Sequence, residues 1–260
     1  MKYNFDEINN RLGTYCTQWD YIEDRFGEKD LLPFSISDTD FKIPKPISKT
    51  IQKVSQSELY GYTRWNHEDF KGSIAQFYKR IHDCEMNLDP SVMYSVSLLI
   101  RLLSKPKDKV VTLNPMYDSF FTVIQDNDRQ LESHYLQAQN GTYEINFSLL
   151  EKQLKDATIF LLCSPHNPTG RIWTYEEMEK IISICKKYGV KIISDEIHMD
   201  IKLKENKHIP LLSFLDIYDE LYTASSCSKT FNVPGLIGSY AILPNSQVKD
   251  EFLHMTIKVD

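Results

Sequence analysis

Two hydrophobic periodicities divide most of the chain into strands and helices. The segment 67–81 (HEDFKGSIAQFYKRI) spaces apolar residues three and four positions apart, which predicts an amphipathic helix. The segments 158–164 (TIFLLCS) and 190–195 (VKIISD) are short and almost continuously apolar, as expected of parallel strands covered on both faces. Alternation of the two patterns predicts a doubly wound α/β sheet. The predicted strands are 109–114, 130–137, 158–164, 190–195 and 220–226, and the predicted helices are 67–81, 96–104, 116–128, 147–155 and 174–189.

The helix 174–189 has the most clearly marked boundaries. Thr174 is a favourable N-cap, and Glu177 three residues later completes a capping box. Gly189 follows the last residue of the periodic pattern, where a left-handed C-terminal residue is common. Farther upstream, the segment 139–143 (QNGTY) predicts a hairpin turn.

Composition and charge exclude several classes of partner. The 260 residues are 42% hydrophobic and carry a formal net charge of −6, so nothing favours a nucleic-acid or anionic-membrane partner. Neither a basic leader followed by an apolar run nor a stretch of 18 apolar residues is present, which predicts a soluble, cytoplasmic protein. The five scattered cysteines include no C-x-x-C pair and favour reduced thiols over a disulfide framework or a zinc site.

Chemically useful side chains follow three of the predicted strands. Asn167 lies in SPHNPTG after the strand 158–164, Asp195 ends the strand 190–195, and Lys229 lies in SCSK after the strand 220–226. Ligands of open α/β sheets bind beyond the carboxyl ends of the strands, so we expect these three residues at one rim. Each also has a purely structural interpretation: a turn amide, a surface or capping acid, and a solvated lysine.

The three residue types match the needs of pyridoxal 5′-phosphate (PLP) chemistry. A lysine desolvated among small side chains favours its neutral amine, which can attack an aldehyde. A carboxylate keeps the pyridine nitrogen protonated, and amide or hydroxyl groups bind the phenolic oxygen and the phosphate. An alternative metal site of Asp195, Glu196, His198 and Asp200 lacks an evident third ligand at metal spacing, so no metal is predicted.

Longer strings around these residues resemble a known family. LLCSPHNPTGRIWTYEE, VKIISDEIHMDI and SSCSKTFNVPGLIGSYAI are similar to fold-type I, class I/II aminotransferase-like enzymes, specifically the MalY/PatB-type cystathionine (cysteine-S-conjugate) β-lyases. GTYCTQWDYIEDRFGEKDLLPFSISDTDF and YGYTRW match the same subgroup, so the resemblance covers essentially the whole chain. It implies an N-terminal arm or small-domain segment at 1–45 and a PLP-binding large domain at 46–260, with a mostly parallel sheet between helices.

The resemblance assigns roles to residues at the three strand ends. Lys229 would be the Schiff-base lysine, Asp195 the partner of the pyridine nitrogen, and Asn167 a donor to the phenolic oxygen. His198, one helical turn from Asp195, would lie near the same oxygen, although a structural histidine is the alternative.

Four further residues complete the site that the resemblance implies. Tyr117 would stack on the pyridine face, although a tyrosine in an apolar run is more often a core residue. Ser226 and Ser228 would lie near the phosphate. Tyr62 would reach the cofactor of a partner subunit, which implies a homodimer.

The implied activity is α,β-elimination from a small amino acid that bears sulfur on its β carbon. Lys229 would take the α proton, and the products would be a thiol, pyruvate and ammonia. An aminotransferase on the same scaffold is one alternative, because lysine, aspartate and asparagine serve both reactions. A catalytically impaired chain with a regulatory or interaction role is another.

The chain departs from the family pattern at two places. SVMYSVSLLIRLL passes directly from the strand before Ser95 into the next helix, where the family has a longer phosphate-binding loop, so we expect weaker cofactor binding. The sequence ends at EFLHMTIKVD, so the C-terminal small domain and the arginine that clamps the substrate carboxylate are expected to be absent. Arg171 is predicted to pair locally and not to replace that arginine.

Overall fold

The computed structural model describes residues 3–61, 67–85, 90–92, 95–203, 206–236 and 238–257. These residues separate into two compact units. One consists of Met1–Thr63 with Cys227–Ile237, and the other of Arg64–Ser226 with Gly238–Asp260. The domain division at residue 45 stays a prediction.

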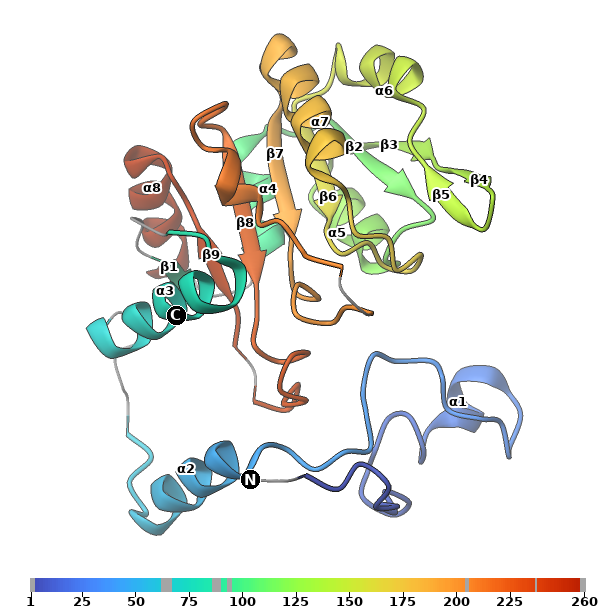
Figure 1. Ribbon diagram of the computed structural model, residues 1–260, viewed down its shortest axis with the longest axis vertical. Helices are drawn as coiled ribbons and strands as arrows, with labels where there is room; N and C mark the ends of the chain where they lie inside the picture. Colours follow the sequence, from blue (N-terminus) through green and yellow to red (C-terminus); the bar gives the residue numbers. More distant parts are fainter. Residues whose placement is uncertain are drawn as a thin grey trace. The chain divides into compact units, whose positions relative to one another are not determined.

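The larger unit contains a seven-stranded sheet with the order β1-β9-β8-β7-β6-β2-β3 (Figure 1). Strands β3, β2, β6, β7 and β8 are parallel, whereas β9 and β1 are antiparallel to their neighbours. The sheet is therefore mostly parallel, as the sequence predicts. The strands are β1 Pro90–Val92, β2 Lys109–Asn114, β3 Gln130–Tyr135, β6 Ile159–Cys163, β7 Lys191–Asp195, β8 Leu221–Ser225 and β9 Tyr240–Ile242.

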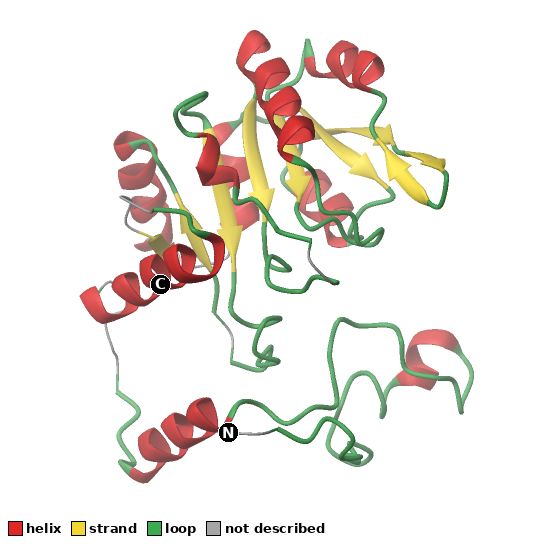
Figure 2. Cartoon of the chain, viewed as in Figure 1, coloured by secondary structure: helices red, strands yellow, loops and turns green. Residues whose placement is uncertain are grey.

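Helices cover both faces of this sheet (Figure 2). The helices α6 and α7 lie in front of the sheet in Figure 1, and α4 and α5 lie behind it. The predicted α/β architecture is thus confirmed. The helices of this unit are α3 Glu68–His82, α4 Ser95–Leu103, α5 Ser119–Asp126, α6 Phe147–Leu154, α7 Tyr175–Tyr188 and α8 Ser246–Ile257, with the short 3-10 helix η1 Leu211–Phe214.

The continuous apolar run of β6 reflects burial on both faces. Phe160 and Leu162 pack into the core beneath α6 and α7, whereas Ile159 and Leu161 pack into the core beneath α4, α5 and α8. Because successive side chains of a strand point to opposite faces, a strand between two helical layers has no polar position. The need to bury both faces of the strand explains the continuous apolar run in the sequence.

The smaller unit contains little regular structure. Its helices are α1 (Ile22–Phe26) and α2 (Lys45–Gln56). The predicted hairpin around 139–143 belongs to the larger unit and consists of β4 (Gln137–Gln139) paired antiparallel with β5 (Thr142–Glu144). No helix among the described residues is both long and apolar enough to span a bilayer.

The capping box of α7 provides a direct test of local structure. Thr174 Oγ1 accepts from Glu177 N at 3.2 Å, and Glu177 Oε2 accepts from Thr174 N at 2.8 Å, which confirms the predicted cap. Thr174→Ala is expected to lower the free energy of unfolding by about 1 kcal/mol, since it leaves a helix N–H without its partner. Urea denaturation would measure the change. Ser183→Ala, on an exposed position of the same helix, is the control and is expected to be nearly neutral.

Candidate active site

A cavity of about 270 Å³ lies at the carboxyl ends of β7 and β8. The two strands are parallel with Asp195 opposite Ala224, so their last residues reach the same edge of the sheet. The first turn of α4 closes another side of the cavity. The residues that line the cavity are Val96, Ser97, Asp195, Ile197, Ala224, Ser225, Ser226 and Ser239.

Asp195 is the acidic group of this cavity. Its Oδ1 accepts a hydrogen bond from Ile197 N at 3.1 Å. Burial raises the pKa of Asp195 to about 6, with a further contribution from the negative charge of Glu196, while the Ile197 hydrogen bond opposes the rise. Asp195 therefore ionises close to neutral pH and responds strongly to a positive group placed beside it.

Serine hydroxyl groups surround the rest of the cavity. Ser226, one of the predicted residues, is buried and donates from Oγ to Gly238 O at 2.6 Å. The sequence analysis missed Ser97, Ser225 and Ser239. Ser225 could have been found as the last residue of a predicted strand, but Ser239 reaches the cavity only because β9 turns back antiparallel beside β8.

Asn167 lies in the loop between β6 and α7. Its backbone N–H donates to Cys163 Sγ at 3.4 Å, and the side chain is partly buried. The preceding His166 is buried, with Nδ1 2.8 Å from Thr169 Oγ1. These contacts hold the loop at the end of β6, the neighbour of β7 in the sheet.

The segment that carries His198 differs from the prediction. Residues after Asp195 form successive turns, with Met199 N donating to Glu196 O at 3.0 Å and Ile201 N donating to His198 O at 2.9 Å. The prediction that His198 lies one helical turn from Asp195 is therefore wrong. The Asp195 side chain binds the backbone N–H of Ile197, and such local bonds compete with helix formation.

Tyr117 is exposed, and this excludes its interpretation as a core residue. Its side chain is 43% accessible, and its ring meets Phe120 edge-on at 5.9 Å between centroids. The ring is therefore available to a ligand. Its stacking role stays a prediction.

Lys229 belongs to the smaller unit and follows the last residue of β8 by four positions. The side chain is partly buried, and Nζ donates to Ser37 O at 2.8 Å. Nearby, the Asn232 amide donates to Thr39 O at 3.0 Å and to Phe41 O at 2.9 Å. The N-terminal segment thus binds the side chains of Lys229 and Asn232, a contact that the sequence analysis did not predict.

Two further predicted residues complete the comparison. Ser228 lies beside Lys229, is partly buried, and accepts from Val233 N through its carbonyl oxygen at 2.8 Å. Tyr62 lies outside the described residues. The roles of both residues stay predictions.

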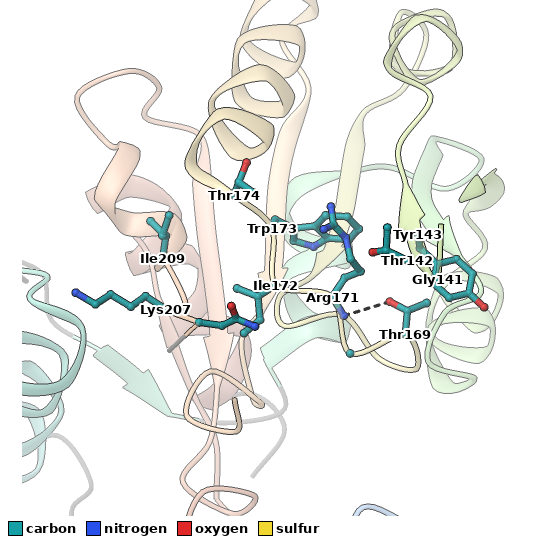
Figure 3. A pocket seen from close by; sticks show the side chains of 12 residues that line it. Gly141, Thr142, Tyr143, Thr169, Arg171, Ile172, Trp173, Thr174, Lys207 and Ile209 are labelled. Carbon is teal, nitrogen blue, oxygen red and sulfur yellow. Dashed lines mark hydrogen bonds between the residues drawn. The ribbon is translucent and has the colours of Figure 1, made fainter. Parts of the chain in front are cut away.

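Arg171 pairs locally, as predicted. It forms an ion pair with Glu177, and its guanidinium lies over the Trp173 ring at 5.0 Å from the centroid. Figure 3 shows this stacking in a separate pocket of about 480 Å³, between the β4–β5 hairpin and the loop that leads into α7. Arg171 is therefore engaged outside the cavity of Asp195.

The cavity lining supplies an acid and hydroxyl groups of the kinds that bind PLP, but it includes neither Lys229 nor Asn167. Asp195 offers an acid for the ring nitrogen, and Ile197 and Val96 offer apolar walls. Serine hydroxyls and the positive N-terminal end of α4 suit an anionic phosphate. Among the described residues, no group of three or more histidine, cysteine, aspartate or glutamate side chains could hold a metal ion.

Comparison with known proteins places this chain in a family. The chain is 40% identical over 258 residues to protein MalY of Escherichia coli K12, and 34% identical over 257 residues to cystathionine beta-lyase PatB of Bacillus subtilis 168. In both comparisons the match covers 96% of this chain and 66% of the relative, so the chain spans about two thirds of their length.

Solved structures agree with these relatives. The PLP-bound C-S lyase from Staphylococcus hominis superposes with a TM-score of 0.90 at 29% identity, over 98% of this chain and 66% of that one. The family model described as aminotransferase class I and II matches residues 29–256. On the fold and these matches, the chain belongs to the class I and II aminotransferase family, with protein MalY, cystathionine beta-lyase PatB and the S. hominis C-S lyase among its relatives.

Proposed function

We propose that this chain is a PLP-dependent C–S β-lyase that acts on cystathionine or other cysteine S-conjugates. The observation that carries the proposal is Asp195, an acid poised near neutrality in a cavity lined with hydroxyls at the N-terminal end of α4. The names of PatB and of the S. hominis enzyme support the reaction type.

Three residues would hold the cofactor. Lys229 would bind its aldehyde through Nζ, Asp195 would keep a proton on the ring nitrogen, and Asn167 would donate to the phenolic oxygen. Bound PLP supplies an electron sink for the pair of electrons left when the α proton departs. Asp195 suits its task because a protonated ring nitrogen beside it favours the carboxylate form.

The protein would also move the proton and exclude water. Lys229 Nζ, once the substrate amine has replaced it at the aldehyde, would be free to take the proton from the α carbon, which allows the thiolate to leave from the β carbon. Tyr117 would cover the ring, and Ser226 and Ser228 would bind the phosphate. Tyr62 would contribute from a partner subunit, so we propose a homodimer. The products would be a thiol, pyruvate and ammonia.

A cystathionine assay tests the proposal. Purified protein supplied with PLP is expected to release thiol and pyruvate from cystathionine without any keto-acid acceptor. Borohydride reduction followed by peptide mapping is expected to find the modification on Lys229. Modification of another lysine, or a protein that stays colourless with PLP, would contradict the proposal.

The family description favours an aminotransferase as the second candidate. The same assay separates the two functions, because an aminotransferase needs a keto-acid acceptor to complete its cycle. Turnover that appears only after 2-oxoglutarate or another keto acid is added would support the second candidate.

A further inference from the structure

Four buried ionisable side chains contact one another in a row that ends at Glu196, the residue after Asp195. His82 Nε2 is 3.0 Å from Asp200 Oδ1, and His208 Nε2 is 3.5 Å from Glu196 Oε2. The two histidine rings meet edge-on at 5.6 Å between centroids. The order is thus acid, base, base, acid, and the side chains come from the end of α3, the turns after β7, and the segment before η1.

Burial of these groups is nearly complete. The side chains of Glu196 and His208 are fully inaccessible, and those of His82 and Asp200 are 1% and 11% accessible. Buried ion pairs contribute little net stability, since desolvation offsets their attraction, and apolar side chains of the same size often serve as well. Fold stability alone therefore does not account for this cluster.

Glu196 fixes the turn that follows Asp195. Its Oε1 accepts from Leu211 N at 2.8 Å and lies 3.3 Å from Ser194 Oγ. Its backbone N–H donates to Ala224 O at 2.9 Å, and its carbonyl accepts from Ser225 Oγ at 3.2 Å. Glu196 thereby ties the residue after Asp195 to β8 and to η1.

The charge of Glu196 also acts on Asp195. Two titratable groups interact electrostatically with Asp195: Glu196, from the following turn, and Cys163, from the adjacent strand β6. The neighbouring positions of β8 and α4 carry Ala224, Ser225, Val96 and Ser97, which have no charge. The His208 imidazole lies on the other side of the Glu196 carboxylate, with Nε2 3.5 Å from Oε2.

We propose that Glu196 and His208 are positioning residues for Asp195, holding its turn in place and setting the negative charge beside its carboxyl group. The proposal rests on the proposed function, in which Asp195 faces the ring nitrogen of the cofactor. It concerns neither the cofactor contacts themselves nor the base that removes the α proton.

The test follows the ionisation of Asp195 in the cofactor-free protein. Aspartate carboxyl carbons are labelled with ¹³C, and Asp195→Asn identifies the signal. Glu196→Gln keeps the size and the hydrogen-bond acceptor but removes the charge, and it is expected to lower the midpoint of Asp195 by about one pH unit. Glu196→Asp keeps the charge and is expected to restore most of the difference.

A matched control separates this local effect from loss of any surface ion pair. Glu151 pairs with Lys187 at 2.7 Å on the surface, and Glu151→Gln is expected to leave the Asp195 midpoint unchanged. His208→Gln removes the imidazole that lies 3.5 Å from Glu196 Oε2, and it is expected to move the midpoint because the Glu196 carboxylate is no longer held in place. If Glu196→Gln does not fold, His208→Gln becomes the deciding variant for this inference. A midpoint that stays within about 0.3 pH unit of the wild type in the deciding variant would overturn the inference.

A PLP titration connects the result to the cofactor. Affinity for PLP is expected to fall as pH drops through the Asp195 midpoint, and Glu196→Gln is expected to move that fall to lower pH by the same amount. Absence of borohydride labelling on Lys229 would defeat the proposed function while leaving the ¹³C result intact. Labelled Lys229 with an unmoved Asp195 midpoint would defeat this inference alone.

Discussion

Lys229→Ala is expected to abolish release of pyruvate from cystathionine, with a loss of at least about a thousandfold in kcat/KM. In the proposed function, Nζ of Lys229 both holds the cofactor and accepts the α proton, so no remaining group replaces it. Steady-state measurement of pyruvate, with PLP in excess, provides the value. The variant should still fold, because Lys229 is only partly buried and its Nζ donates to a backbone carbonyl, that of Ser37.

Lys186→Ala is a matched control for this experiment. Lys186 also donates to a backbone carbonyl, that of Ile217 at 2.6 Å, but it lies on α7. Its removal is expected to leave kcat/KM within about twofold of the wild type, since surface contacts of this kind contribute little. Activity in Lys229→Ala comparable to that of this control would exclude Lys229 as the base.

Asp195→Asn is expected to stabilise the cofactor-free protein and to impair the enzyme. The pKa of Asp195 rises from 3.8 to about 6 on folding, so the folded state binds the proton more tightly than the unfolded state. The cost of ionising Asp195 is therefore complete above about pH 6, shrinks as pH falls from 6 toward 4, and is absent only below the unfolded pKa of 3.8. Asparagine carries no such cost.

The expected gain at pH 7.5 is about 2 kcal/mol in the free energy of unfolding, allowing for the partial exposure of Asp195. Chemical denaturation at pH 7.5 and at pH 4 measures it, and the difference between variant and wild type should shrink to about 0.5 kcal/mol or less at the lower pH. Asp216→Asn, at an exposed position, is the control and should show no such pH dependence. Lyase activity should fall at least about a hundredfold, because asparagine cannot keep the ring nitrogen protonated. A difference between variant and wild type that is the same at both pH values would show that the pKa of Asp195 is not raised by folding.

The two effects of Asp195→Asn would have one physical origin. A carboxyl group whose pKa is raised by burial lowers the stability of the cofactor-free protein when it ionises. The same group becomes an advantage once a cationic ring nitrogen lies beside it. The same argument explains why a buried Glu196 next to Asp195 is tolerated. A bound cation would offset the repulsion between the two carboxylates.

Local sequence signals predicted most of the regular structure of the larger unit. The strand β2 has the predicted bounds, and β6, β7 and α7 differ from prediction by one residue at their ends. These elements are determined by short-range requirements: burial of β6 between two helical layers, and the capping box at Thr174. The turn after Asp195 was mispredicted because the bond from Ile197 N to its side chain does not appear in hydrophobic periodicity.

The candidate site likewise has some residues that the sequence predicted and others that only the structure revealed. The sequence by itself identified the family and three chemical groups that follow strands: Asn167, Asp195 and Lys229. That Lys229 meets the other two residues stays a prediction. Only the tertiary structure placed Ser239 at the cavity of Asp195, through the antiparallel return of β9, and paired His82 with Asp200 across 118 positions of the chain. Strand order and the contacts of buried charges depend on how distant segments pack, and hydrophobic periodicity reports only which face of each segment is buried.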